Sequence, residues 1–199
     1  CAIGSRPINF HLDALKKMGT KIKIKDGYIF ASAKKGLKGC TIKFPKISVG
    51  ATENVLIAAC FSKGETKLRN CAIEPEINDL ISFLKKMGCK IKRIGKRGID
   101  ILGVKEFKST IHKVIFDRIE TGTYIIAAAL TKGKLKIKNI NPKIMLTEIR
   151  LLNKMGVDIL KKKNYIIVSR SKKLKSINVV TKPYPGFPTD LQAQIMVLM

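Results

Sequence analysis

The chain has 199 residues, of which 45% are hydrophobic, and its 40 basic and 14 acidic side chains give a net charge of +26. That apolar content is enough for a folded core and excludes a disordered chain. No stretch approaches the roughly 18 apolar residues of a membrane span, and no signal-peptide pattern opens the sequence, so we expect a soluble, cytoplasmic protein.

The charge pattern and the cysteines indicate whether the sequence is typical of an RNA-binding protein, a metal site or a disulfide framework. Lysines alternate with isoleucine in KIKIKD and KLKIKN, as solvent-facing strand positions do. Aromatic residues make up 6% of the chain and no RNP-like motif is present, so a basic RNA-binding repeat module stays only as an alternative. The five cysteines form no CxxC pair and the two histidines are far apart, which predicts neither a metal site nor disulfides.

Three stretches of the chain are near copies of one another. They carry Met18, Met87 and Met155, which are 69 and then 68 residues apart. Each copy predicts an amphipathic helix that ends at a glycine and is followed by a strand, a turn and a second strand. In the first copy Asp26-Gly27 is a hairpin signal. The sequence therefore predicts repeated α/β units with the methionines in the core.

A second helix is predicted at the same period. The stretches SVGATENVLIAACFSKG and RIETGTYIIAAALTKG both end in a Lys-Gly pair and lead into a short strand. Thr52, Thr121 and Asp190 are each 69 residues apart and stand near predicted helix starts, where unpaired N–H groups and the helix dipole favour anions. Three such helix starts could converge on one ligand.

Seven motifs spread over the chain give a family resemblance: CAIGSRP, INFH, LKG, KISVGATEN, EPEI, DRIETGT and FPTDLQAQ. With these motifs the chain resembles the UDP-N-acetylglucosamine 1-carboxyvinyltransferases, a family of enolpyruvyl transferases. The resemblance implies a two-domain inside-out α/β barrel that is incomplete at both ends here. Residues 1–115 would form part of the first barrel domain and residues 116–199 part of the second, with the substrates held between the domains.

The resemblance also implies an activity. Such an enzyme moves the enolpyruvyl group of phosphoenolpyruvate onto the 3-hydroxyl of UDP-N-acetylglucosamine through a tetrahedral intermediate and releases phosphate. This is the first committed step of peptidoglycan precursor synthesis, on which cell-wall growth, cell shape and division depend. The resemblance implies two small-molecule substrates, no metal or organic cofactor, and neither nucleic acid nor membrane as a partner.

The resemblance assigns roles to individual residues. Cys1 matches the cysteine that donates a proton to phosphoenolpyruvate, forms a covalent adduct with it and is alkylated by fosfomycin, and Arg6 is close enough in sequence to tune its thiol. Asp190 matches the general base that takes the proton of the 3-hydroxyl. The implied substrate-binding residues are Arg6, Pro7, Ile8, Asn9, Phe10, His11, Lys46, Ile47, Ser48, Val49, Gly50 and Asp190.

Several alternatives stay open at this point. His11 is also interpreted as a packed or capping histidine, and Asp190 as an N-cap aspartate. Asn9 stands where the family commonly has an acidic residue, and Ile73 where it often has arginine. The whole chain is alternatively an enolpyruvyl transferase for shikimate 3-phosphate, which does not use the loop cysteine, or a fragment without activity of its own.

Overall fold

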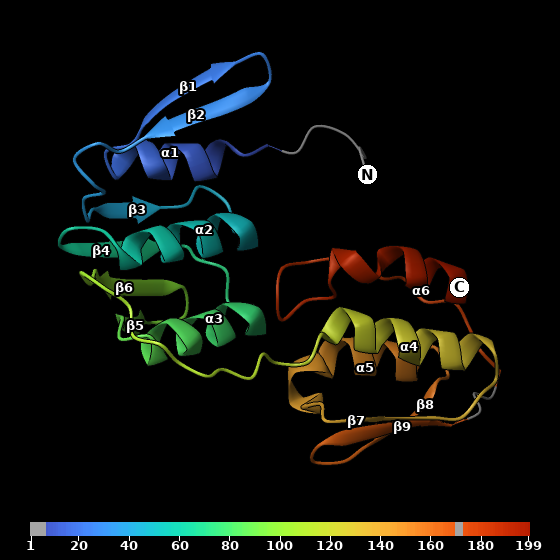
Figure 1. Ribbon diagram of the computed structural model, residues 1–199. Coiled ribbons are helices and arrows are strands. Elements are labelled where there is room, and N and C mark those ends of the chain that lie inside the picture. The colour runs from blue at the N-terminus through green and yellow to red at the C-terminus, as the bar shows by residue number, and fades with distance from the viewer. Residues whose placement is uncertain (1–6, 170–172) are drawn as a thin grey trace. The chain divides into compact units, whose positions relative to one another are not determined.

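A computed structural model describes residues 7–169 and 173–199 of the chain. The chain divides into two compact units, unit 1 from Cys1 to Lys113 and unit 2 from Val114 to Met199 (Figure 1). The boundary lies two residues before the crossing between barrel domains that the sequence predicts at residue 115.

Unit 1 combines helices with a four-stranded sheet and a separate hairpin. Its sheet has the order β3-β4-β6-β5, with β3 parallel to β4 and the other neighbours antiparallel. The elements are α1 (Asn9–Lys17), β1 (Lys21–Lys25), β2 (Tyr28–Ser32), β3 (Thr41–Lys43), α2 (Val49–Cys60), β4 (Glu65–Arg69), α3 (Pro75–Lys86), β5 (Lys90–Ile94) and β6 (Gly98–Leu102).

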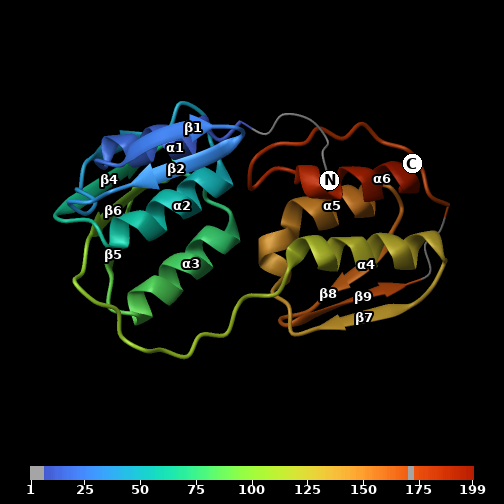
Figure 2. The ribbon, with the colours of Figure 1, turned by 45° about the horizontal axis from the view of Figure 1, so that its top comes forward.

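Helix α2 is the central helix of unit 1. Both views show it between α1 and α3 (Figures 1 and 2), and it also contacts β6. Its sequence is apolar almost all round, and Val55, Leu56 and Ala59 are fully buried against Leu68 and Ile99 of the sheet. A helix that is hydrophobic on every side requires such a central place.

Unit 2 repeats this plan with a three-stranded antiparallel sheet of order β7-β9-β8. Helices α4 and α5 lie on one face of the sheet (Figure 2), and α4 packs on the sheet and on α6. The elements are α4 (Arg118–Leu130), β7 (Leu135–Lys138), a 3-10 turn η1 (Pro142–Met145), α5 (Leu146–Lys154), β8 (Asp158–Lys161), β9 (Tyr165–Ser169), a 3-10 turn η2 (Thr189–Leu191) and α6 (Gln192–Leu198).

The predicted helix-and-hairpin repeat is confirmed in all three copies. Helices α1, α3 and α5 are each followed by an antiparallel strand pair. The residues that end these helices, Gly19, Gly88 and Gly156, have φ values of 97°, 104° and 97°, which only glycine adopts without strain. Met18 and Met155 are fully buried, as expected of core residues, whereas Met87 is half-buried and packs against the core of unit 1.

The first hairpin differs from its two counterparts. Strands β6 and β9 each pair with a second strand, β4 or β7, whereas β1 is the one strand that pairs with β2 among the residues that the structure describes. Every residue of β2 is exposed, including Phe30 at 58%. The sequence pattern therefore forms the same hairpin three times, but only two of the copies are built into a larger sheet.

Candidate functional site

The start of α2 holds the KISVG segment that the sequence singled out. Ser48 is the N-cap residue, in an extended conformation, and its Oγ accepts the backbone N–H of Ala51 at 3.3 Å. Ile47 and Val49 pack against the core of unit 1 and Lys46 is exposed. Half-buried neighbours on both sides of Ser48, packed against the core, therefore fix the backbone at this helix start.

Two backbone donors at this helix start are open. Within residues 7–169 and 173–199, the N–H groups of Val49 and Gly50 have no acceptor. Unpaired N–H groups and the positive end of the helix dipole together favour an anion, and Lys46 adds a positive charge two residues before the cap. The arrangement is suited to an oxyanion such as a phosphate group.

The structure brings the first predicted segment to this helix start. The ring of His11 in α1 lies against Gly50, where a Cβ atom would be 3.2 Å from His11 Nε2. Glycine at position 50 therefore allows the ring to approach the first turn of α2. The Nδ1 atom of His11 is buried and has no hydrogen-bond partner among the described residues. The interpretation of His11 as a packed histidine agrees with this geometry.

A hollow of about 450 Å³ lies between α1 and β3. Of the expected substrate residues, Phe10 lines it, and Pro45 lines it directly before Lys46. Pro7, Ile8 and Asn9 are exposed at the start of α1. The hollow is further lined by Asp13, Ala14, Lys16, Lys17, Ile42, Lys43 and Phe44. No motif in the sequence pointed to Lys16, Lys17 and Lys43, because lysine is common throughout the chain.

The start of α4 is built differently. Its N-cap residue is Asp117, whose carboxylate accepts the backbone N–H groups of Ile119 at 2.7 Å and Glu120 at 3.1 Å. Arg118 is buried and pairs with Glu148 at 3.2 Å. The protein thus supplies its own anion at this helix start.

Asp190 lies in the 3-10 turn η2, directly before α6. The interpretation of Asp190 as an N-cap aspartate is wrong, because the cap positions of η2 and α6 are Pro188 and Leu191 and neither has a side-chain cap bond. Leu191 is fully buried and packs so closely on Gly122 of α4 that a Cβ atom there would clash with it. This contact anchors the turn, and the side chain of Asp190 is exposed.

The two threonines at the equivalent repeat position form hydrogen bonds inside their own units. Thr52 Oγ1 donates to Ser48 O at 2.7 Å and accepts the N–H of Ala72 at 3.1 Å. Thr121 Oγ1 donates to Asp117 O at 2.8 Å. Both side chains are buried, so this position stabilises the first turn of the helix in two copies and presents a carboxylate to solvent in the third.

Cys1 and Arg6 lie outside the described residues. Lys46, Ile47, Ser48, Val49 and Gly50 belong to unit 1 with the segment from Pro7 to His11, whereas Asp190 belongs to unit 2. The predicted contributions of Cys1, Arg6 and Asp190 to one common site therefore remain predictions.

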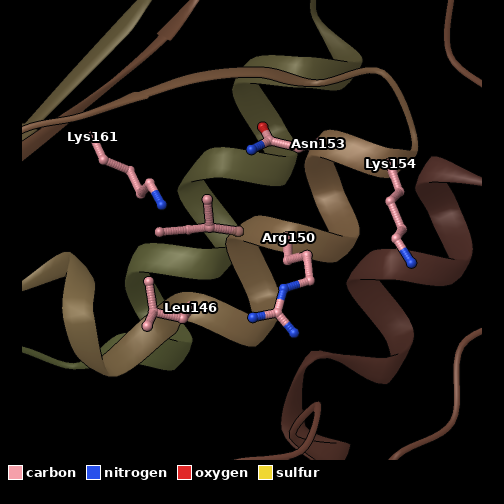
Figure 3. A pocket seen from close by; sticks show the side chains of 6 residues that line it. Leu146, Arg150, Asn153, Lys154 and Lys161 are labelled. Carbon is pink, nitrogen blue, oxygen red and sulfur yellow. The ribbon is translucent and has the colours of Figure 1, made fainter.

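A second hollow, of about 390 Å³, lies in unit 2 and is lined by none of the expected site residues. Figure 3 shows Arg150, Asn153 and Lys154 of α5 and Lys161 of β8 around it. Among the described arginines, Arg150 is the one whose guanidinium has no protein partner. The hollow is basic, and all of its lining residues belong to unit 2.

Two kinds of feature are absent from the residues that the structure describes. No group of three or more His, Cys, Asp or Glu side chains in residues 7–169 and 173–199 could hold a metal ion. Over the same residues, no helix is both long and apolar enough to cross a membrane.

Comparison with known proteins decides the family. Residues 1–199 match the family model described as EPSP synthase (3-phosphoshikimate 1-carboxyvinyltransferase). The chain belongs to the EPSP synthase family. Its membership covers every residue of the sequence, including those that the structure does not describe.

Curated relatives show which enolpyruvyl transferases the chain is most similar to in sequence. The chain is 61% identical to a UDP-N-acetylglucosamine 1-carboxyvinyltransferase of Pelagibacter ubique and 51% identical to one of Endomicrobium trichonymphae. Both matches cover 100% of this chain and 48% of the relative. The chain therefore spans about half the length of these relatives, and the resemblance stated from the seven motifs is confirmed.

Solved structures show the fold. The enolpyruvyl transferase NikO from Streptomyces tendae matches 98% of this chain and 49% of its own, with a TM-score of 0.86 and 23% identity. EPSP synthase from Acinetobacter baumannii matches 86% of this chain and 41% of its own, with a TM-score of 0.66 and 20% identity. The predicted enolpyruvyl transferase fold is confirmed.

Proposed function

We propose that the protein carrying this chain transfers the enolpyruvyl group of phosphoenolpyruvate to the 3-hydroxyl of UDP-N-acetylglucosamine and releases phosphate. The product would enter peptidoglycan synthesis. The observation that carries the proposal is the open helix start at Lys46–Gly50, which is suited to the diphosphate of a sugar nucleotide. Curated relatives with 61% and 51% identity bear the name of this activity.

Each proposed role follows from the chemistry of the residue. The carboxylate of Asp190 would take the proton of the 3-hydroxyl as its oxygen attacks C2 of phosphoenolpyruvate, while the Cys1 thiol gives a proton to the C3 methylene. A tetrahedral intermediate results. Loss of phosphate together with a proton from C3 then restores the double bond. Arg6 would bind an anionic group of the substrates through its planar guanidinium.

The same family contains the transferase for shikimate 3-phosphate, so family membership alone does not choose the acceptor. The names of the most similar curated relatives favour UDP-N-acetylglucosamine. The presence of Cys1 within CAIGSRP favours it as well, because the shikimate enzyme does not use a cysteine there. Neither relatives nor motifs support the RNA-binding alternative.

The direct test measures phosphate release from phosphoenolpyruvate by the protein carrying this chain. We expect release only when UDP-N-acetylglucosamine is present, no release with shikimate 3-phosphate in its place, and none from Cys1→Ala. Cys40→Ala, at a half-buried cysteine of unit 1, is the matched control and should keep the activity. Release without the sugar nucleotide, or an unchanged rate in Cys1→Ala, would contradict the proposal.

A cheaper test uses the reactivity of the thiols. Burial raises the pKa of Cys71 to about 11 and raises the pKa values of Cys40, Cys60 and Cys89 as well, so these four react slowly as nucleophiles at neutral pH. Fosfomycin should therefore give one adduct, mapped to Cys1 by peptide mass spectrometry. An adduct on Cys40 that forms as fast as the one on Cys1 would refute the assigned role of Cys1.

A further inference from the structure

The segment that joins the two units has no regular secondary structure from Gly103 to Asp117, yet its first half is held on unit 1. The N–H of Gly103 donates to Gly64 O at 3.3 Å, and the N–H of Val104 donates to Cys60 O at 2.8 Å. Gly103 lies so close to the backbone of Ser62 that a Cβ atom would clash with it. The segment therefore begins tightly packed against the end of α2.

The middle of the segment is held by a ring and by a backbone bond. Phe107 packs against the core of unit 1, and its ring centroid lies 4.0 Å from that of Phe61. The N–H of Lys108 donates to Met87 O at 2.9 Å, at the end of α3. These contacts cover the ends of two helices.

The last contact with unit 1 is made by His112. Its Nε2 lies 3.1 Å from Oδ1 of Asp79 in α3, and the two side chains are only 10% and 15% exposed. An ionised carboxylate accepts but cannot donate, so Nε2 carries the proton of this bond. The His112 ring also packs on Phe83, one helical turn further along α3, with 5.3 Å between centroids. A side chain 33 positions distant from Asp79 is thus fastened along one face of α3.

The first contacts of the segment with unit 2 follow within a few residues. Phe116 packs against the core of unit 2, and Asp117 caps α4. Between His112 and Phe116 lie Lys113, Val114 and Ile115, of which Val114 is 72% exposed. In the part of the chain that the structure describes, no hydrogen bond is found for the backbone of these three residues.

We propose that the contact of His112 with Asp79 and Phe83 is a clamp that completes the attachment of residues 103–112 to unit 1 and confines the free connection to Lys113, Val114 and Ile115. Without the clamp the free connection would extend back toward Lys108. Each residue released gains backbone conformational entropy. A short connection limits the range of orientations that two joined bodies can sample. Loss of the His112 contact would lengthen the free connection and so widen that range.

Backbone amide exchange measures the clamp directly. In the unchanged chain we expect the amide of Lys108 to be protected and the amide of Val114 to exchange at the rate of an open chain. His112→Ala and Asp79→Ala should each speed exchange at Lys108 by about tenfold, the loss expected for a hydrogen bond to a charged group. His112→Phe, which keeps a ring on Phe83, should give a smaller increase.

Two controls separate a local clamp from general loss of stability. Asp100→Ala removes a different ion pair of unit 1, the 2.6 Å contact with Arg69, and should leave the exchange of Lys108 unchanged. The amide of Cys71, bonded to Arg97 O, reports on unit 1 away from the segment and should not respond to His112→Ala. If Lys108 exchanges at its original rate in both His112→Ala and Asp79→Ala, or if Cys71 accelerates equally, the proposal is overturned.

Discussion

The starts of α2 and α4 occupy the same place in two copies of one repeat, yet their cap residues differ in charge. The cap of α4 is a carboxylate, and the cap of α2 is a neutral hydroxyl. At α4 the carboxylate of Asp117 accepts two backbone N–H groups of the first turn. At α2 the corresponding residue is Ser48, 69 positions earlier, which accepts only one and leaves those of Val49 and Gly50 open. One helix start is neutralised by the protein, and the other is available to a ligand.

This difference shows how one copy of a repeated fold can keep an open helix start. The repeat supplies several helix starts with the same backbone geometry, and a single side chain at the cap decides whether a start is structural or open. The third copy adds a further variation, since Asp190 replaces the buried threonines Thr52 and Thr121 with an exposed carboxylate. Four predictions, each with a matched variant, test how far this comparison holds.

The largest effect is expected at the third copy. Asp190→Asn should lower kcat for phosphate release about 10²- to 10⁴-fold, because an amide cannot take the proton of the 3-hydroxyl. Thr121→Val, at the equivalent position of the second copy, should leave kcat near its original value. Steady-state kinetics at saturating substrates measure both. A loss of kcat in Thr121→Val as large as in Asp190→Asn would remove the distinction between the two copies.

The next effect concerns the buried threonines. Thr52→Val removes the donor to Ser48 O and leaves the buried N–H of Ala72 without an acceptor, which costs about 1–3 kcal/mol. Thr121→Val breaks one bond and leaves no such N–H behind, so its cost should be smaller. Urea unfolding curves give both free energies of unfolding. Equal costs would mean that the bond to Ala72 contributes nothing.

A third substitution converts the open helix start into the closed one. Ser48→Asp places a carboxylate at the cap of α2, where it caps as well as serine and repels a diphosphate. We expect the affinity for UDP-N-acetylglucosamine to fall about tenfold by isothermal titration calorimetry, with no loss of thermal stability. Ser48→Thr keeps a neutral cap and should bind normally. Full affinity in Ser48→Asp would show that the diphosphate lies elsewhere.

The smallest effect is electrostatic and depends on pH. Burial raises the pKa of the Glu53 carboxyl in α2 above its ordinary value of 4.5, and nearby Glu76 and Glu74 raise it further. The folded state binds the proton of the Glu53 carboxyl more tightly than the unfolded state does. The contribution of this protonation to the free energy of unfolding is therefore complete below pH 4.5 and is lost as the pH rises through the raised pKa of the folded state. Glu53→Gln should therefore raise Tm by up to about 2 °C at pH 7.

The same substitution should give almost no gain near pH 4, where the Glu53 carboxyl is largely protonated in both states. Glu106→Gln changes charge equally at an exposed carboxylate of the same unit and should leave Tm unchanged at both pH values. Melting curves by circular dichroism at pH 4 and pH 7 suffice for all the variants. A fall in Tm for Glu53→Gln at pH 7 would indicate that the carboxylate has a stabilising partner.

Much of the fold was predictable because local patterns determine it. The helix period, the glycines at helix ends and the Asp26-Gly27 turn gave α1, β1 and β2 correctly, and the apolar stretch from Val49 to Cys60 gave the central helix of unit 1. These signals depend on residues close in sequence, so they can be recognised without a structure.

The details of the site were less predictable. The 69-residue spacing identified Thr52 and Thr121 as equivalent, but it carried no information on whether a hydroxyl faces a ligand or the carbonyl four residues back. The bond between Asp79 and His112 joins residues 33 positions apart and has no local signal. The motif DRIETGT does not show that Asp117 is a helix cap, which only the atomic distances reveal.

The bare hairpin β1–β2 has a consequence for anyone who handles this polypeptide alone. On β1 the exposed side chains of Lys21, Lys23 and Lys25 repel a neighbouring chain, whereas β2 reads YIFAS and has no charge along its free edge. An uncharged apolar strand with unpaired N–H and C=O groups is a template for edge-to-edge association. Solutions of the 199-residue chain should turn turbid as they are concentrated, and the aggregates should be joined through β2.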